Sequence, residues 1–109
     1  MRPGRMPGGF NINEMMKQAQ KLQADMEKKQ AELAEREYTA TAGGGAVTAV
    51  VTNGLVKTLT IAPDAIDPDD VELLADMITA AVNDALTQCK EETAREMSKL
   101  TGGVGGGLF

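Results

Sequence analysis

Apolar residues recur at steps of three and four through the first third of the chain. Such spacing places them along one side of a helix. The stripe consists of Ile12, Met15, Ala19, Leu22, Met26 and Leu33. Asn11 stands directly before it and Glu14 follows three residues later, a combination that is typical of a helix N-terminus. The pattern predicts a narrow amphipathic helix that begins after Asn11.

The pattern changes after residue 37 to short runs rich in threonine, valine and other strand-forming residues. Three glycines at residues 43–45 separate the first run from the second. Asn53 and Gly54 separate the second from the third, and Asn-Gly favours a type I′ hairpin turn because both positions take positive φ. We predict a three-stranded antiparallel meander that ends before Pro63.

The Asn-Gly turn also sets the expected register of the last two strands. It pairs Val51 with Val56 and Val50 with Lys57. Strict alternation of side chains then gives apolar residues to both faces of the sheet. They are Val47, Val51 and Val56 on one face and Val50, Leu55, Leu59 and Ile61 on the other. Because a sheet with one face in water alternates more cleanly, we expect each face to be covered.

A second apolar stripe, from residue 71 to residue 100, predicts a long C-terminal helix. Asp67 is its expected N-cap, and Pro68 takes the first helical position, where a missing N–H costs nothing. The glycines at residues 102–103 are expected to end it. A helix of about 33 residues is roughly 50 Å long, whereas strands of about seven residues span roughly 23 Å. Both helices therefore project beyond the sheet, and their projecting ends can lie together.

These elements predict an α+β fold in the order α-β-β-β-α. We expect one domain at residues 11–101, between a flexible N-terminal lead (residues 1–10) and a flexible glycine-rich tail (residues 102–109). Aromatic residues make up 3% of the chain, which leaves few large side chains for a core, so we expect a second copy to complete it as a homodimer. The residues expected at the dimer interface are Val47, Val50, Val51, Val56, Leu59, Ile61, Ile78 and Val82.

The composition removes most classes of enzyme. The chain has no histidine and one cysteine, so one copy supplies neither a zinc site of nitrogen and sulfur ligands nor a Ser-His-Asp or Cys-His group. We expect no catalytic residue, metal, cofactor or small-molecule substrate. Cys89 falls on the second apolar stripe, which favours a buried structural thiol over a redox sensor. No secretory or membrane-spanning run is readable, so we expect a cytoplasmic protein.

The net charge of −5 is unevenly distributed. Residues 1–30 carry six basic and three acidic side chains, whereas residues 63–89 carry seven acidic and no basic ones. A protein polarised in this way can bind a polyanion at its basic end. Lys17, Lys21 and Lys28 share the side of the first helix away from the apolar stripe. They indicate either a phosphate-binding face or a solvated face in which Lys21 pairs with Asp25.

Several segments together resemble a known family. Residues 13–23, with the sequence NEMMKQAQKLQ, resemble the N-terminal helix of the YbaB/EbfC nucleoid-associated proteins. The Asn-Gly hairpin, the Ile-Ala-Pro at residues 61–63 and the Asn-Asp-Ala at residues 83–85 follow in that family's order. The resemblance covers residues 11–101. It implies a bacterial, intertwined or tweezer-like homodimer that contacts double-stranded DNA with helical arms and serves nucleoid organisation and gene regulation without catalysis.

The resemblance directs attention to the basic residues of both helices and of the N-terminal lead. The expected DNA-binding residues are Lys17, Lys21, Lys28, Lys29, Lys90, Arg95, Lys99, Arg2 and Arg5. Contacts of this kind go mainly to phosphates, so we expect weak or broad sequence specificity. The second helix does not match the basic arm that the resemblance implies, because acidic residues balance the basic residues in its C-terminal third. The alternative function is a dimeric adapter that holds replication or recombination factors.

Overall fold

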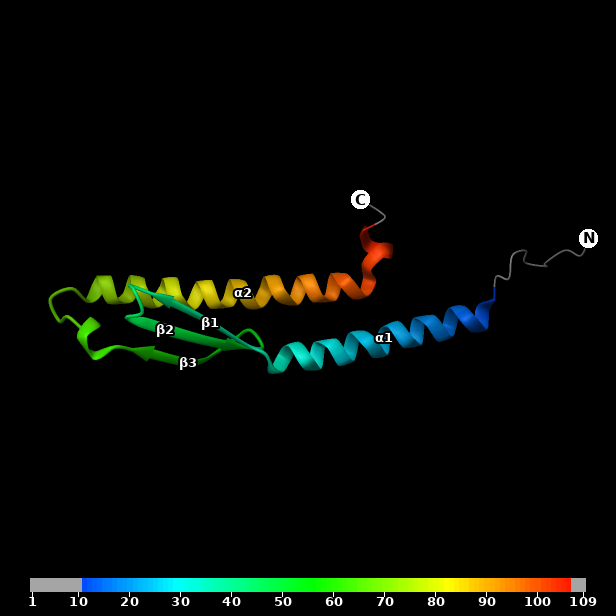
Figure 1. The fold of residues 1–109 in the computed structure, drawn as a ribbon, viewed down its shortest axis with the longest axis horizontal. Coiled ribbons are helices and arrows are strands. Elements are labelled where there is room, and N and C mark those ends of the chain that lie inside the picture. Colours follow the sequence, from blue (N-terminus) through cyan, green and yellow to red (C-terminus); the bar gives the residue numbers. More distant parts are fainter. Residues whose placement is uncertain (1–10, 107–109) are drawn as a thin grey trace, which may run out of the picture.

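The structure, a computed structural model of the chain, describes the backbone of residues 11–106 and the side chains of residues 11–101. Its elements follow the predicted order α-β-β-β-α (Figure 1). They are helix α1 (Ile12–Glu35), strands β1 (Glu37–Ala42), β2 (Val47–Thr52) and β3 (Leu55–Ile61), the short 3₁₀ helix η2 (Pro63–Ala65) and helix α2 (Val71–Gly106). The expected N-terminal lead, with Arg2 and Arg5, and the last three residues of the expected tail lie outside the described residues.

Helix α1 begins where its cap was predicted. The Asn11 side-chain oxygen accepts hydrogen bonds from the backbone N–H groups of Asn13, at 2.8 Å, and Glu14, at 3.4 Å. These bonds satisfy two of the donors that a helix leaves unpaired at its first turn. The helix runs for 24 residues and ends at Glu35, after which the backbone of Arg36 is extended and leads into β1.

The predicted cap of α2 is wrong by one turn. The backbone N–H of Leu73 donates to Asp70 at 3.2 Å, so Asp70 caps the helix. The Asp67 carboxylate instead accepts from the backbone N–H of Asp69 at 2.9 Å, and this local bond holds Asp67 and Pro68 in a turn before the helix. The helix also continues to Gly106, past the glycines at residues 102–103. Glycine disfavours a helix by about 1 kcal/mol relative to alanine, but it does not block one sterically.

The sheet is the predicted antiparallel meander, in the order β1-β2-β3. Asn53 and Gly54 have φ of 53° and 75°, as a type I′ turn requires. Val51 lies opposite Val56 as expected, but Val50 lies opposite Thr58 and not Lys57. The register shifts at this point, so that Lys57 is the extra residue of a β-bulge.

The bulge changes which residues share a face of the sheet. Leu59 lies opposite Ala49 and Ile61 opposite Val47, so both belong to the face that packs on α2. Their predicted place on the other face is therefore wrong, because strict alternation ignores the extra residue. The outer face keeps two apolar residues, Val50 and Leu55. Its other members are mostly threonines, namely Thr39, Thr41, Thr48, Thr52, Thr58 and Thr60.

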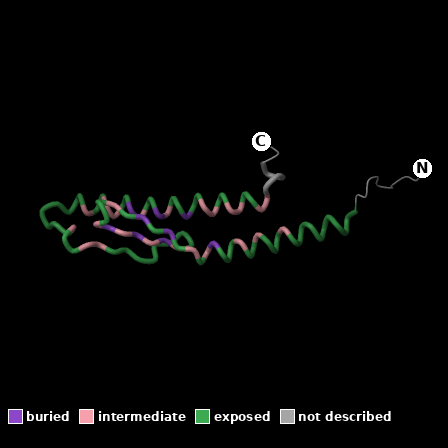
Figure 2. Tube along the Cα trace, in the orientation of Figure 1, coloured by how far each residue is buried: buried purple, intermediate pink, exposed green. Residues whose placement is uncertain are grey.

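The core lies between the sheet and α2 (Figure 2). Ala81, Ala85 and Cys89 of α2 are buried against the sheet, and the small alanines allow a close approach of the helix. Cys89 is thus the buried thiol that the stripe predicted. The sheet contributes Tyr38, Ala40, Val47, Ala49 and Val51. These residues belong to β1 and β2, and the inward face of β3 is left largely uncovered, with Val56 and Leu59 45% and 40% exposed.

Candidate nucleic-acid interface

Helix α1 has two halves with different surroundings. In the C-terminal half, Leu33 is buried, and Leu22, Met26 and Lys29 are partly buried beside α2. In the N-terminal half every residue from 11 to 20 is exposed (Figure 2), and this half projects past the end of α2 (Figure 1). We call residues 12–21 the free arm. Both helices project beyond the sheet and lie together there, as their lengths predicted, and α1 continues further, past the end of α2 (Figure 1).

Three exposed lysines follow one side of α1. With 3.6 residues per turn, Lys17, Lys21 and Lys28 fall within about 40° of one another around the helix axis. We call them the lysine stripe. Within residues 11–101, none of the three forms an ion pair. The Lys21–Asp25 pair that a purely solvated face would contain is therefore not formed. Glu14 and Asp25 lie beside the stripe around the helix axis.

Other cations predicted for DNA contact are held by a carboxylate of α2. Glu96 accepts from Lys29 of α1 at 3.4 Å and from Lys99, one turn along α2, at 2.9 Å. We call this group the Glu96 clamp. The hydrogen bond from Lys99 lowers the pKa of Glu96 below its usual value; partial burial opposes this effect, and Lys29 adds to it. The clamp joins α1 to α2 and places two cations beside one carboxylate, and Glu32 also lies 3.5 Å from Lys29.

A second carboxylate repeats this arrangement one turn earlier in α2. Glu92 accepts from Arg36, which follows α1, at 3.2 Å and from Arg95 at 3.1 Å. We call this group the Glu92 clamp. Arg36, Glu92 and Glu96 were not predicted as part of any site. The spacing of Glu92 to Arg95 and of Glu96 to Lys99 is a sequence signal for ion pairs, but nothing local indicates the pairs that join α1 to α2.

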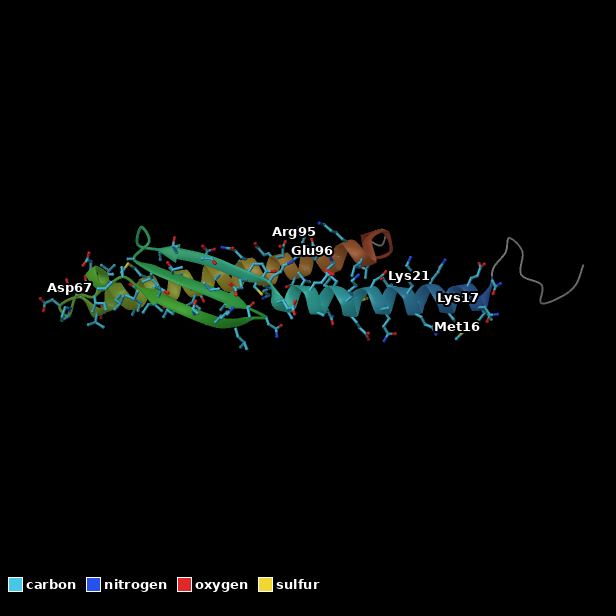
Figure 3. The ribbon with its side chains drawn as sticks, turned by 60° about the horizontal axis from the view of Figure 1, so that its bottom comes forward. Met16, Lys17, Lys21, Asp67, Arg95 and Glu96 are labelled. Atoms are coloured by element: carbon cyan, nitrogen blue, oxygen red, sulfur yellow. The ribbon has the colours of Figure 1, made fainter. Side chains whose placement is uncertain are left out.

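The structure thus separates the predicted DNA-binding residues into two groups. Lys29, Arg95 and Lys99 are paired with carboxylates. The lysine stripe and Lys90 are exposed and form no ion pair with the described residues. Figure 3 shows Lys17 and Lys21 on the free arm and Arg95 beside Glu96 on α2. In the first group, a neighbouring carboxylate already offsets part of the positive charge of each cation.

An open groove of about 680 Å³ lies beside the clamps. It separates the C-terminal half of α1 from α2 and reaches the turn between β2 and β3. Its walls are mainly apolar. The lining residues are Gln30, Leu33, Ala34, Asn53, Gly54, Leu86, Cys89, Lys90, Thr93 and Ala94. The groove thus reaches the turn from which strand β3 starts.

The residues expected at a dimer interface have different degrees of exposure. Val47 and Val51 are fully buried within one chain. Ile61, Ile78 and Val82 are partly buried at the margin of the core. Val56 and Leu59 are exposed on the inward face of β3, whereas Val50 is partly buried on the opposite, threonine-rich face. Only the residues outside the core offer surface to a second copy.

The described residues offer little that could perform chemistry. Within them, no group of three or more metal-binding side chains lies together, and no helix has both the length and the apolar character needed to cross a membrane. Tyr38 has a buried hydroxyl with no hydrogen-bond partner among these residues. Burial, and then the charge of Glu92, raise the pKa of the Tyr38 phenol, so this hydroxyl stays protonated and contributes packing.

Sequence comparison connects this geometry to known proteins. The sequence model of the YbaB/EbfC DNA-binding family matches residues 7–104. A nucleoid-associated protein of Clostridium novyi (strain NT) is 59% identical over 104 residues, which cover 94% of this chain and 90% of that protein. A nucleoid-associated protein of Acetivibrio thermocellus is 55% identical over 113 aligned positions that span 100% of both chains. These descriptions refer to DNA and the nucleoid and to no catalysed reaction.

Structural comparison supports the same fold. A crystal structure of an uncharacterized protein from Helicobacter pylori superimposes with a TM-score of 0.72, over 85% of this chain and 99% of that one. The two sequences are 16% identical, so the likeness concerns the fold alone. It confirms the predicted α+β architecture of two long helices and a three-stranded meander.

Proposed function

This chain belongs to the YbaB/EbfC DNA-binding family, and from that premise we propose that it is a nucleoid-associated protein that grips duplex DNA as a homodimer. The lysine stripe of α1 makes the main phosphate contacts. Binding takes place in the cytoplasm, at the nucleoid, and contributes to nucleoid organisation and gene regulation. The observation that carries the proposal is the set of three exposed lysines on one side of α1 that form no ion pair with the described residues, two of them, Lys17 and Lys21, on the free arm.

The contrast between free and clamped cations supports the choice of α1. A lysine of the stripe presents its full charge to a phosphate, whereas Glu96 already offsets part of the charge of Lys29 and Lys99. Lysine binds phosphate as a point charge without reading base edges. Specificity should therefore be broad, and affinity should depend on salt through the release of counterions.

The proposed dimer interface is the inward face of β3 together with the neighbouring side of α2. Val56 and Leu59 are exposed there, and Ile61 borders them. Ile78 and Val82 precede the groove residue Leu86 by steps of four, so they lie on the same side of α2. Val47 and Val51 act through the core, and Val50 faces away from this surface. A second copy would cover these apolar residues and the groove in one contact.

A salt titration of duplex binding tests the mechanism. Two lysine stripes offer six cations, and neutralising about six phosphates predicts a loss of affinity of roughly 10³-fold between about 50 and 200 mM salt. Lys21→Glu should weaken binding clearly, whereas Lys57→Glu, the same charge change on the sheet, should have little effect. Affinity that does not change with salt would contradict phosphate contact. A dimer that ignores duplex DNA but retains a protein partner would instead favour the adapter function.

A further inference from the structure

The junction between α1 and the sheet is a single residue, Arg36. Helix α1 ends at Glu35 and strand β1 begins at Glu37, so the helix runs directly into the strand (Figure 1). The backbone N–H of Arg36 donates to the carbonyl of Leu33 at 3.2 Å, and its own carbonyl accepts a hydrogen bond from the Thr52 hydroxyl of β2. The backbone of Arg36 is therefore bonded to the helix on one side and to the sheet on the other.

The side chain of Arg36 adds a third attachment. Its guanidinium donates to the carboxylate of Glu92, on α2, at 3.2 Å. Burial raises the pKa of the Tyr38 phenol, Glu92 raises it further and Arg36 lowers it, so both charges act on this buried side chain of the core. Arg36 thus connects α1, the sheet and α2 at one point.

The same carboxylate has a second partner that joins nothing to α1. Arg95 donates to Glu92 at 3.1 Å, but both residues belong to α2 and lie one turn apart. Arg36 and Arg95 carry the same charge and share one acceptor. They differ in what they connect, because the Arg95 pair stays within one helix and the Arg36 pair crosses from the base of α1 to α2.

We propose that Arg36 is a positioning residue, whose contact with Glu92 sets the direction in which α1 leaves the sheet and so holds the lysine stripe in place for the duplex. The inference rests on the proposed function and names a residue that supports it without touching DNA. An arm already held in one direction loses less conformational freedom on binding, and such preorganisation raises affinity. The pair of Lys29 with Glu96 is a second link between the helices, so loss of Arg36 loosens the arm without releasing it.

The Arg36 pair should matter more for the direction of the arm than for the stability of the fold. The side chains of Arg36 and Glu92 are 40% and 29% exposed, and ion pairs in contact with water contribute little to stability. The buried side chain of Leu33 remains in place when the pair is removed. Removal of the guanidinium should therefore leave the unfolding midpoint close to that of wild type.

The first test compares the duplex affinities of three variants at one low salt concentration. Arg36→Gln should bind about three- to tenfold more weakly than wild type, because its arm is less ordered before binding. Arg95→Gln removes the same charge from the same carboxylate and should lose about twofold, from charge alone. Arg36→Lys keeps a cation that can reach Glu92, and it should restore most of the affinity that Arg36→Gln loses.

The second test measures the direction of the arm without DNA. Spin labels are placed on Gln20→Cys in the free arm and Ser98→Cys in α2, two exposed positions, in a Cys89→Ala background. Labelled protein is diluted with unlabelled protein, so that a dimer contains one labelled chain. Arg36→Gln should broaden the distribution of distances between the labels, whereas Arg95→Gln and Arg36→Lys should leave it as in wild type.

Two results would overturn the inference. Equal affinities of Arg36→Gln and Arg95→Gln would reduce the role of Arg36 to its charge. A distance distribution that Arg36→Gln leaves unchanged, or an affinity loss matched by a lower unfolding midpoint, would show that Arg36 does not position the arm.

The outcomes also separate this inference from the function on which it rests. Wild-type protein that does not bind duplex DNA would contradict both. Wild-type protein that binds the duplex, and loses that binding when the lysine stripe is reversed, supports the proposed function whatever the Arg36 variants do. The inference then depends on the comparison of Arg36 with Arg95 and on the label distances.

Discussion

The two halves of α1 are built from the same kinds of residue, yet the fold gives them different tasks. In the C-terminal half, Leu33 is buried and Lys29 is bound by Glu96. In the free arm, Met15 is exposed and Lys17 has no partner among the described residues. The comparison teaches that neither charge nor apolar spacing defines a binding surface. What the rest of the fold leaves unpaired defines it.

The largest effect should come from reversing the lysine stripe. The triple variant Lys17→Glu/Lys21→Glu/Lys28→Glu replaces six positive charges per dimer with six negative ones. It should weaken duplex binding at least about 100-fold at low salt. A mobility-shift titration measures the loss. Native mass spectrometry and circular dichroism should show that the dimer and the helices survive. Retained binding would move the interface away from the free arm.

The next largest effect is on the free energy of unfolding. It compares the two ends of the apolar stripe of α1. Leu33→Ala should lower the free energy of unfolding by about 2–4 kcal/mol, because it leaves a cavity between α1 and the core. Ile12→Ala removes an exposed side chain and should change this free energy by less than about 0.5 kcal/mol. Urea unfolding of both variants provides the measurement. Equal losses would mean that the free arm is packed as firmly as the clamped half.

A smaller effect should follow from opening one clamp. Glu96→Gln releases Lys29 and Lys99 from their shared carboxylate, so duplex affinity should rise about threefold through two extra available cations. Glu91→Gln is the matched control, since it removes the same charge from an exposed residue of α2 that forms no ion pair with the described residues. An equal rise in both variants would attribute the gain to net charge and not to release of the cations.

The smallest effect is a pH dependence of stability. The pKa of Glu96 is lowered in the folded chain, mainly by the hydrogen bond from Lys99. Its contribution is therefore fully present above the unfolded-state pKa and is lost as the pH falls through the lower, folded-state pKa. Unfolding midpoints should fall on the acid side more steeply for wild type than for Glu96→Gln. Identical acid profiles would show that the clamp contributes no measurable stability.

Local sequence signals predicted most of the fold. The cap at Asn11, the apolar spacing of α1 and the Asn-Gly turn act over four residues or fewer, so they can be identified without the rest of the chain. The cap of α2 was misplaced because Asp67 and Asp70 are equally good capping residues by type. The bulge at Lys57 was missed because it depends on how β3 aligns with a core that α2 completes from far along the chain.

Sequence spacing could also predict part of the geometry of the candidate site. The spacing of Lys17, Lys21 and Lys28 identified one exposed face of a helix. Which cations are available could not be identified, because Lys29 and Glu96 are 67 residues apart in sequence. Sequence spacing shows which side chains share a face, and only the tertiary structure shows which of them already have a partner.

The two clamps also give the molecule a mechanical property. They hold α1 to α2 only at the C-terminal end of α1. The free arm is therefore attached at one end, and its ten residues project by about 15 Å. A rotation of roughly 10° at the clamped base moves the tip by roughly 3 Å, which is close to the axial spacing of successive phosphates on one DNA strand. In the proposed complex, a small bend at the base of the free arm would therefore move its lysines by about the distance between neighbouring phosphates.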